Sequence, residues 1–281
     1  MPQQFSFLEV SAIIDAAKAE AIGSTTSSLT ALQDTQLIER VEQINTDFVN
    51  SAHTRHHKGG WSWMEEVTNF QTVAQTTLNG AVVAAAATFI LTDASEWDTE
   101  DMTVIQTAKN AIDFVENESK SSNTLTVSTT TGANVISMDH ASGERCEKLY
   151  SLPSDYAKTR KLFVNSIEYF YHRADLFPIA LTFDTRGDYL FMPRGIGDQD
   201  VTHYYEKRPA TLTATTDTTD IPTSFQRYPI EMLKAHIYGV RRKRQDIGTS
   251  LQLAAVAMEE ALDYDVQRIT QGSTSGIDVD Y

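Results

Sequence analysis

The stretch that decides the fold of this 281-residue chain runs from Ser151 to Arg244. It opens with Ser151-Leu152-Pro153-Ser154-Asp155-Tyr156 and continues into an aromatic segment, Leu162 to Tyr171. A second segment with alternating side chains, Val201 to Lys207, lies further along. Because successive side chains of a strand point to opposite faces, both segments are predicted to be strands.

A hairpin is predicted between these two strands, over Ile179 to Pro193. It folds over Asp184-Thr185-Arg186-Gly187-Asp188, where glycine and aspartate favour a tight reversal of the chain. The Arg-Gly-Asp triplet in this segment invites an adhesion role, but a turn explains it without one. The linker Thr211 to Thr219 has almost nothing to bury and is expected at the surface.

Two helices are predicted after this linker. Ile221-Pro222 begins a helical region, and Pro229 suits the first position of the regular helix. The basic run Arg241-Arg242-Lys243-Arg244 is expected in its last turn, where positive charge complements the carbonyl end of the dipole, and Gly248 is expected to end it. A sustained three–four apolar repeat predicts a final helix over Leu251 to Ile269.

Two further helices are predicted near the start of the chain. Apolar residues from Phe7 to Ala21 recur at steps of three and four, and Gly23 is placed to end that helix. A second apolar stripe runs from Leu37 to Phe48, with the pair Asp34-Thr35 available as caps. At Trp61-Ser62-Trp63 the pattern becomes an alternation, which is typical of a strand or an extended arm.

The segment between Gln75 and Lys148 is rich in Thr, Val, Ser and Ala, which favours a small all-β module. Its predicted strands are Val82 to Leu91, Met102 to Thr107, Ala111 to Val115 and Thr124 to Ser128. The apolar residues of Gln106 to Ser119 also fit a helical period, so a helix within residues 100–120 stays an alternative to a strand.

These elements together predict an α+β fold, in which N- and C-terminal helices form a helical bundle and a central β domain is inserted between them. The predicted divisions are 1–58 for the N-terminal helices, 59–210 for the β section, 211–270 for the C-terminal helices and 271–281 for an extended tail. Within the β section we expect an inserted module at about 76–148 and a hairpin sheet at 149–210.

Composition argues against several classes of protein. The chain has 38 acidic and 23 basic residues, a formal net charge of −15, whereas proteins that bind nucleic acid through its phosphates present dense basic faces. The apolar run from Ala81 to Leu91 is too short to span a bilayer, and Met1-Pro2-Gln3-Gln4 does not look like the start of a signal peptide. We therefore expect synthesis in the cytoplasm and no membrane partner.

Few residues in the sequence are candidates for metal binding, phosphate binding or catalysis. His53, His56 and His57 share a helical spacing and, with Glu65 or Glu66, are a candidate ion site, although a solvated helix end is the simpler explanation. Gly195-Ile196-Gly197-Asp198 lacks the third glycine and the helix of a phosphate-binding loop.

The remaining candidates for catalysis have simpler explanations. Cys146, the single cysteine, has His140 as its nearest histidine in the sequence and is interpreted as a structural thiol. The pairs Asp198/Asp200 and Asp263/Asp265 are expected on solvated faces of an acidic protein. We therefore predict no enzyme activity and no catalytic, metal or cofactor-binding residue.

Some residues are instead candidates for contacts with other subunits. Two tryptophans spaced as i and i+2 either pack in the core or contact a neighbour, and the basic run is either a solvated helix end or a salt-sensitive contact with an acidic partner surface. The predicted interface residues are Trp61, Trp63, Arg241, Arg242, Lys243, Arg244 and, in the tail, Ile277, Val279 and Tyr281.

The order of the motifs resembles that of head–tail adaptor proteins of tailed viruses, also called head-completion or neck proteins. Leu152-Pro153-Ser154-Asp155-Tyr156 resembles the Leu-Pro-x-Asp-Tyr signature that opens their sheet, and Tyr204-Tyr205-Glu206-Lys207-Arg208-Pro209 resembles a later strand. Ala81 to Ser95 looks like the start of the β insertion found in some members.

This resemblance implies a structural virion protein located in the neck of the particle. It implies a ring, typically a dodecamer, that joins the portal protein to a tail or stopper protein and continues the channel for double-stranded DNA. Its helices would pack between neighbours, its tail would engage the portal, and an acidic channel would let DNA pass without specific binding. The alternatives are a stopper, a tail-tube or a receptor-binding protein and, more remotely, a virion-associated hydrolase.

Overall fold

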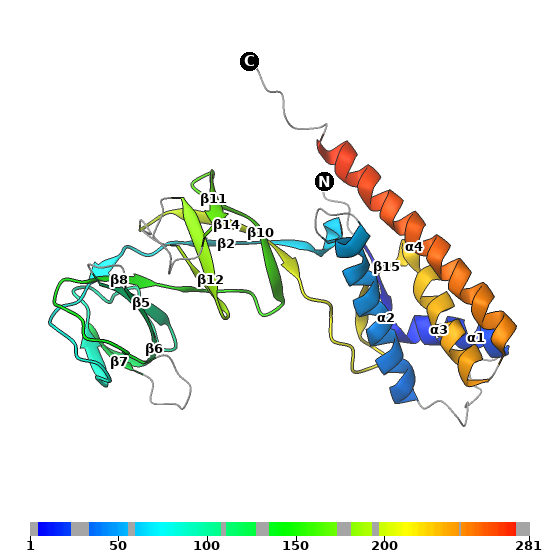
Figure 1. The fold of residues 1–281 in the computed structure, drawn as a ribbon, viewed down its shortest axis with the longest axis horizontal. Helices are drawn as coiled ribbons and strands as arrows, with labels where there is room; N and C mark the ends of the chain where they lie inside the picture. Colours follow the sequence, from blue (N-terminus) through cyan, green and yellow to red (C-terminus); the bar gives the residue numbers. More distant parts are fainter. Residues whose placement is uncertain are drawn as a thin grey trace, which may run out of the picture. The chain divides into compact units, whose positions relative to one another are not determined.

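The computed structural model describes residues 5–23, 34–55, 60–107, 111–127, 135–172, 181–192, 197–241 and 243–273. They belong to two compact units (Figure 1). The terminal unit combines Met1–Glu65 with Lys207–Tyr281, and the central unit is Glu66–Glu206. The two ends of the chain therefore share one unit, and the sequence between them makes the other.

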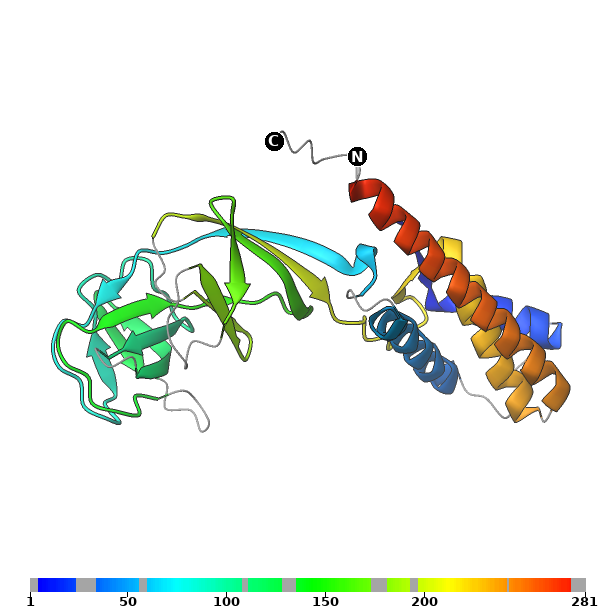
Figure 2. The ribbon, with the colours of Figure 1, turned by 45° about the horizontal axis from the view of Figure 1, so that its top comes forward.

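The terminal unit places four α-helices around a short two-stranded sheet. Strand β1 (Phe7–Glu9) pairs antiparallel with β15 (Thr218–Pro222). The helices are α1 (Val10–Ile22), α2 (Asp34–Arg55), α3 (Arg227–Val240) and α4 (Arg244–Ser273), with 3-10 turns η1 (Ser62–Met64) and η2 (Thr223–Phe225). Figure 2 shows α3 and α4 side by side, and α3 also packs against α1 and α2.

Two local predictions hold in the N-terminal helices. Helix α1 ends at Gly23, whose φ of 73° is left-handed and whose N–H bonds the carbonyl of Ala19 at 2.9 Å. Helix α2 begins at Asp34, the first residue of the predicted cap pair. The three–four repeats of both helices face the core, where Ile13, Val41 and their apolar neighbours are buried.

The core of the terminal unit contains a stack of aromatic rings. Phe48 stacks on Trp61 with a centroid distance of 4.7 Å, and Trp61 stacks on Trp63 at the same distance. The two indole N–H groups donate to backbone carbonyls of Phe48 at 2.9 Å and Asp220 at 3.2 Å. Ring pairs of this kind contribute about 1 kcal/mol each beyond the area they bury.

The central unit is built from strands only, in the part of it that the structure describes. One sheet has six strands in the order β3-β8-β5-β6-β7-β4. Their bounds are β3 (Thr76–Thr77), β4 (Thr88–Ile90), β5 (Met102–Gln106), β6 (Ile112–Ser121), β7 (Thr124–Val127) and β8 (Arg145–Lys148).

This six-stranded sheet closes on itself. Leu78 and Leu91 form a bridge just beyond β3 and β4, which are the two ends of the strand order. The N–H groups of Thr92 and Asn79 donate to Thr77 and Ile90 carbonyls, each at 2.8 Å. Its interior is filled by buried residues that include Leu78, Phe89, Leu91, Ile105, Val115, Leu125 and Cys146.

The other sheet has seven strands in the order β2-β14-β10-β11-β12-β13-β9. Their bounds are β2 (Glu65–Gln71), β9 (Tyr150–Ser151), β10 (Tyr156–Val164), β11 (Ile167–Tyr171), β12 (Thr182–Arg186), β13 (Tyr189–Phe191) and β14 (Asp200–Lys207). Phe191 of β13 meets Phe114 of β6 edge-on at 6.2 Å, so the two sheets share an apolar layer.

The predicted fold class is wrong. Across the described ranges the chain is mostly β, with fifteen strands in three sheets and four α-helices, rather than a helical bundle with an inserted β domain. A β ladder is present even in the terminal unit, where Ile221 is fully buried on β15 instead of starting a helix. The helices therefore pack on one another and, through α1 and α2, on the β1–β15 ladder.

Several element predictions hold in the central unit and two fail. The hairpin β12–β13 turns at Gly187, whose φ is 56°, and the strand predicted at Val201–Lys207 is β14. Where the structure describes residues 106–119, the open alternative is a strand, since Gln106 ends β5 and β6 begins at Ile112. The strand predicted over Val82–Leu91 is wrong, because it is limited to β4 (Thr88–Ile90) after a positive φ at Ala85. The single strand predicted over Leu162–Tyr171 is wrong, because positive φ angles at Asn165 and Ser166 turn the chain between β10 and β11.

Four predictions in the terminal unit also fail. Trp61-Ser62-Trp63 enters a 3-10 turn instead of a strand, because both rings turn inward. The linker Thr211–Thr219 is not wholly at the surface, since Leu212 is 3% and Thr219 is 2% exposed. Of the basic run, Arg241 follows the last residue of α3 and Arg244 begins α4, and Gly248 lies inside α4 rather than ending a helix.

Candidate functional site

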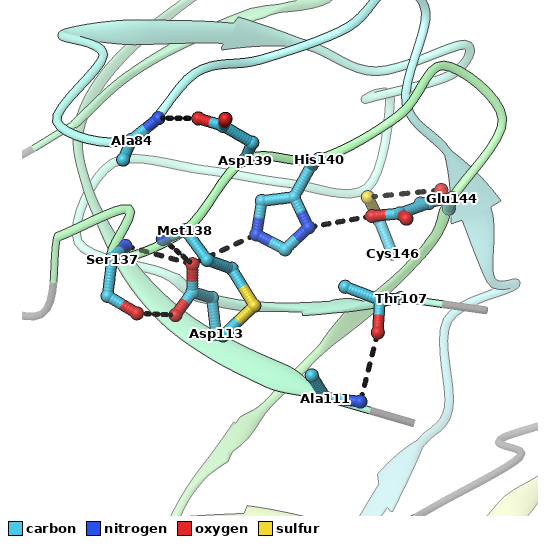
Figure 3. Close-up of polar contacts among 10 residues, drawn as sticks. All are labelled: Ala84, Thr107, Ala111, Asp113, Ser137, Met138, Asp139, His140, Glu144 and Cys146. Atoms are coloured by element: carbon cyan, nitrogen blue, oxygen red, sulfur yellow. Dashed lines mark hydrogen bonds and ion pairs between the residues drawn. The ribbon is translucent and has the colours of Figure 1, made fainter. Parts of the chain in front are cut away.

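The central unit holds a buried histidine between two carboxylates (Figure 3). Nε2 of His140 lies 2.9 Å from Oδ2 of Asp113, and Nδ1 lies 2.7 Å from Oε2 of Glu144. The imidazole is fully buried, and the two carboxylate side chains are 5% and 13% exposed. We call Asp113, Ser137, His140 and Glu144 the His140 cluster.

The closed sheet positions each member of this cluster. Asp113 on β6 lies opposite Ile105 on β5, and residues directly opposite in a ladder point to the same face, here the interior. His140 is fixed by a backbone bridge to Val82, with N–H to carbonyl distances of 2.7 and 2.9 Å. Glu144 lies in the turn that leads into β8.

Asp113 is held as a carboxylate. Burial by itself raises the pKa of this carboxyl, but hydrogen bonds from the Ser137 hydroxyl, the His140 ring and the backbone N–H groups of Ser137 and Met138 outweigh it and lower the pKa. An ionised carboxylate only accepts hydrogen bonds. His140 therefore satisfies both carboxylates when each of its ring nitrogens carries a proton.

This arrangement is not that of an activated nucleophile. The Ser137 hydroxyl bonds Asp113 and not the imidazole, whereas a serine nucleophile needs its base at the hydroxyl. The Cys146 thiol lies 3.7 Å from the Glu144 carbonyl, and burial, followed by the Glu144 and Glu147 charges, raises its pKa. The cluster is thus suited to tie residues 137–144 to β6.

A second buried cluster lies in the seven-stranded sheet. The Tyr205 hydroxyl on β14 donates to Oδ1 of Asp155 at 3.1 Å, and Nε2 of His203 lies 2.9 Å from Oγ1 of Thr159 on β10. The Tyr156 hydroxyl reaches the same Thr159 oxygen at 3.1 Å. We call these five residues the Tyr205 cluster.

Two titrating groups of the Tyr205 cluster, His203 and Tyr205, are kept neutral. Burial lowers the pKa of His203 to about 4, because the neighbours of the ring include the Thr159 hydroxyl and the rings of Tyr156 and Tyr205. Burial, then the hydrogen bond and the charge of Asp155, raise the pKa of Tyr205 to about 12. The cluster therefore joins two segments through hydrogen bonds from neutral donors and through ring contacts.

The predicted interface residues have different environments. Trp61 and Trp63 are 1% and 7% exposed, so the structure places them in the core of the terminal unit. Arg241 and Lys243 are exposed, and Nζ of Lys243 lies 5.7 Å from the centroid of the Tyr238 ring. The side chains of Arg242 and Arg244, and the tail residues Ile277, Val279 and Tyr281, lie outside what the structure describes.

The histidine and glycine candidates give no site. The side chain of His53 and the residues His56 and His57 lie outside the described residues. Within the ranges that are described, no group of three His, Cys, Asp or Glu residues is arranged to hold a metal ion. Gly197 packs so closely on Ala74 that a Cβ there would come within 2.3 Å of its Cα, which explains this glycine without a phosphate.

The Arg-Gly-Asp triplet is part of a tight turn, as predicted. Nε of Arg186 lies 3.0 Å from Oδ2 of the buried Asp184, and its guanidinium lies 5.3 Å from the centroid of the Phe114 ring. These contacts hold the arginine against the sheets. The geometry therefore assigns Arg186 a packing role.

The two aspartate pairs that the sequence suggests have different environments. Asp198 and Asp200 are both exposed, and Asp198 lines a polar cavity of about 320 Å³ together with Gln71 and Glu96. Asp263 is exposed, whereas Asp265 is buried and accepts hydrogen bonds from the backbone and hydroxyl of Ser62. The second pair is therefore split between solvent and the core.

Comparison with known proteins adds little to this picture. No family model and no curated protein matches the chain. Among solved structures, it is similar to the Gp54 tailspike of Acinetobacter baumannii bacteriophage AP22 in complex with A. baumannii capsular saccharide, with 21% identity and a TM-score of 0.23 over 30% of this chain. The chain spans 15% of that tailspike chain. This weak likeness is to a phage protein, and a score this low carries no argument about fold or function.

In the part of the chain that the structure describes, no helix has the length and apolarity needed to cross a bilayer.

Proposed function

We propose that this chain is a structural virion protein of a tailed virus, the head–tail adaptor whose ring joins the portal to the tail. The observation that carries the proposal is the Tyr205 cluster. It brings together the two sequence motifs on which the resemblance rests, Leu152–Tyr156 and Tyr204–Pro209, through the hydrogen bond between Tyr205 and Asp155.

The cluster makes the two motifs one structural feature. Tyr156 lies 6.1 Å from Tyr205 and 5.9 Å from His203, measured between ring centroids. Two short motifs that matched by chance would have no reason to contact each other across some fifty residues of sequence. The contact between them supports a shared sheet architecture with the adaptor proteins.

The finer parts of the proposal follow from the same resemblance. The ring is a dodecamer in the neck of the virion, with the portal on one side and a tail or stopper protein on the other. The net charge of −15 suits a channel through which double-stranded DNA passes without binding. The role is structural, without enzyme activity, and the tail at 271–281 contacts the portal.

The geometry disfavours one alternative. A receptor-binding role through the Arg-Gly-Asp triplet needs an arginine that projects into solvent, whereas Arg186 pairs with Asp184 and lies over Phe114.

Electron microscopy of the purified protein, alone and mixed with the portal protein of the same genome, tests the proposal. We expect ring-shaped particles that cap the portal. Full-length protein that leaves portal rings bare overturns the adaptor function.

The tail assignment has its own test. Removal of Gly272–Tyr281 is expected to reduce binding to immobilised portal, and a variant with the same ten residues in scrambled order is the matched control. Equal binding by the full-length, truncated and scrambled proteins refutes a role of the tail and leaves the ring itself standing.

A further inference from the structure

The outer surface of α4 carries acidic and apolar residues together. Val256 and Val266 are 51% and 42% exposed, so this surface faces away from the core. Glu260 and Asp263 are exposed on the same surface. At 3.6 residues per turn these four residues lie on one side of the helix. We call them the acidic face.

The connection between α3 and α4 presents the opposite combination. Arg241 and Lys243 are exposed, and the neighbouring Val240 is 39% exposed. The carbonyl of Tyr238 accepts a hydrogen bond from the Lys243 N–H at 2.9 Å, which fixes the backbone of this turn. We call Val240, Arg241 and Lys243 the basic patch.

The two surfaces of one copy are too far apart to pair with each other. From Arg244 to Glu260 the helix rises about 24 Å, at 1.5 Å per residue, which exceeds the reach of an arginine or lysine side chain. Both surfaces combine an exposed valine with charge of a single sign, and the signs are opposite. Complementary surfaces that cannot meet within a chain are suited to meet between chains.

We propose that the basic patch of one copy docks on the acidic face of α4 in a second copy. The contact is head-to-tail, so each copy uses one surface on either neighbour, and repetition closes a ring. It rests on the proposed adaptor function, for which it names the contact between subunits. Burial of Val240 against Val256, one turn from Glu260, supplies the apolar part, and the charges set the register.

Charge reversal tests this contact. We expect R241E/K243E and E260K/D263K each to weaken self-association at least tenfold in sedimentation velocity, because each brings like charges together. An equimolar mixture of the two variants restores association, since every contact in the mixture again joins opposite charges. All four exchanged side chains are on the surface, and circular dichroism checks that each variant keeps its helices.

Matched controls separate the contact from net charge. E39K/D47K makes the same charge change on exposed residues of α2, and K158E/K161E makes it on exposed residues of β10. Both are expected to associate like the wild type. Unchanged association in the reversal variants, failure of the mixture to recover, or a wild-type chain that stays monomeric at its highest soluble concentration overturns the contact. Portal capping, read by microscopy on the same samples, decides the adaptor function separately.

Discussion

Two histidines are buried in the central unit, and their surroundings are opposite. His140 lies between the carboxylates of Asp113 and Glu144, whereas His203 contacts a threonine hydroxyl and two tyrosine rings. They are 2% and 1% exposed, so burial does not distinguish them. The partners differ in kind: carboxylate oxygens accept hydrogen bonds from the ring of His140, whereas His203 has a hydroxyl and aromatic rings beside it.

The His140 cluster and the Tyr205 cluster also connect the parts of their sheets in different ways. The His140 cluster joins a turn to a strand through hydrogen bonds between one ring and two nearly buried carboxylates, so loss of the ring removes both contacts at once. The Tyr205 cluster joins β10 and β14 through hydroxyl hydrogen bonds and ring contacts, which tolerate the loss of one member better. Variants at the two histidines are therefore expected to differ in size of effect and in pH dependence.

The largest effect is expected from H140L. Leucine fills the volume but removes both ring nitrogens that bond Asp113 and Glu144 in the interior. A buried polar group that loses its hydrogen-bond partner costs about 1–3 kcal/mol, and two groups are affected, so we expect a loss of about 3 kcal/mol. Urea denaturation at pH 7, with hydrogen exchange of the amides at 76–148, measures the loss. A loss below about 1 kcal/mol would mean that the ring contributes little to holding the turn at 137–144.

A smaller effect is expected from D113N, which keeps the shape and removes the charge. The amide oxygen still accepts from the backbone N–H groups of Ser137 and Met138, but the amide nitrogen cannot accept from the Ser137 hydroxyl, and the charge that strengthened these hydrogen bonds is gone. We expect a loss of about 2 kcal/mol in the same denaturation assay. Wild-type stability in this variant would mean that the charge of Asp113 contributes nothing to the cluster.

The pH dependence is expected to come from His203 first. Its folded pKa of about 4 lies below the ordinary value of 6.5, so the unfolded chain binds the proton more tightly. The stability that neutral His203 contributes is complete above pH 6.5 and declines by about 2 kcal/mol as the pH falls towards 4. The lowered pKa of Asp113 acts in a more acidic range, because its contribution is lost only as the pH falls below its ordinary value of 3.8.

H203Q tests this assignment, because glutamine does not titrate. Denaturation midpoints at pH 7 and pH 4.5 are expected to differ clearly in the wild type and much less in the variant. An equal shift in both proteins would assign the pH dependence to other groups.

The smallest effect is expected from Y205F. It removes one hydroxyl from the Tyr205 cluster and leaves the ring contacts with Tyr156 and His203 in place. A net hydrogen bond contributes about 1 kcal/mol, so the loss should be of that size. Y169F, a tyrosine of β11 for which no hydroxyl contact is described, is the control and is expected to change stability less. A loss as large as that of H140L would remove the distinction between the two clusters.

Local sequence patterns predicted the elements whose signals are local. The hairpin at β12–β13 has its turn residues and its alternation within a dozen positions, and the repeats of α1 and α2 are equally short in range. The pairing of β1 with β15 was missed, because Phe7-Leu8-Glu9 is too short to show a period and joins Pro222 and Thr218 across most of the chain. That ladder is the reason the fold class was mispredicted.

The sequence does not predict the His140 cluster. It shows His140 only as the histidine nearest to Cys146, and nothing in it connects His140 to Asp113, 27 positions away. The link arises from the closure of the six-stranded sheet, which turns Asp113 inward and brings the turn at 137–144 across it. The sequence likewise predicts a solvated Asp265. Its hydrogen bond with Ser62 exists only because both ends of the chain share one unit.

The closed sheet also gives the protein a built-in chemical reporter. Cys146 is the only cysteine of the chain and is fully buried inside that sheet, with its thiol held in the unreactive protonated form. A thiol-directed reagent can therefore modify the folded protein only when β8 separates from its neighbours. The rate of labelling measures how often this happens, without any engineered probe, and the same protection leaves every surface position open to a cysteine introduced for site-specific attachment.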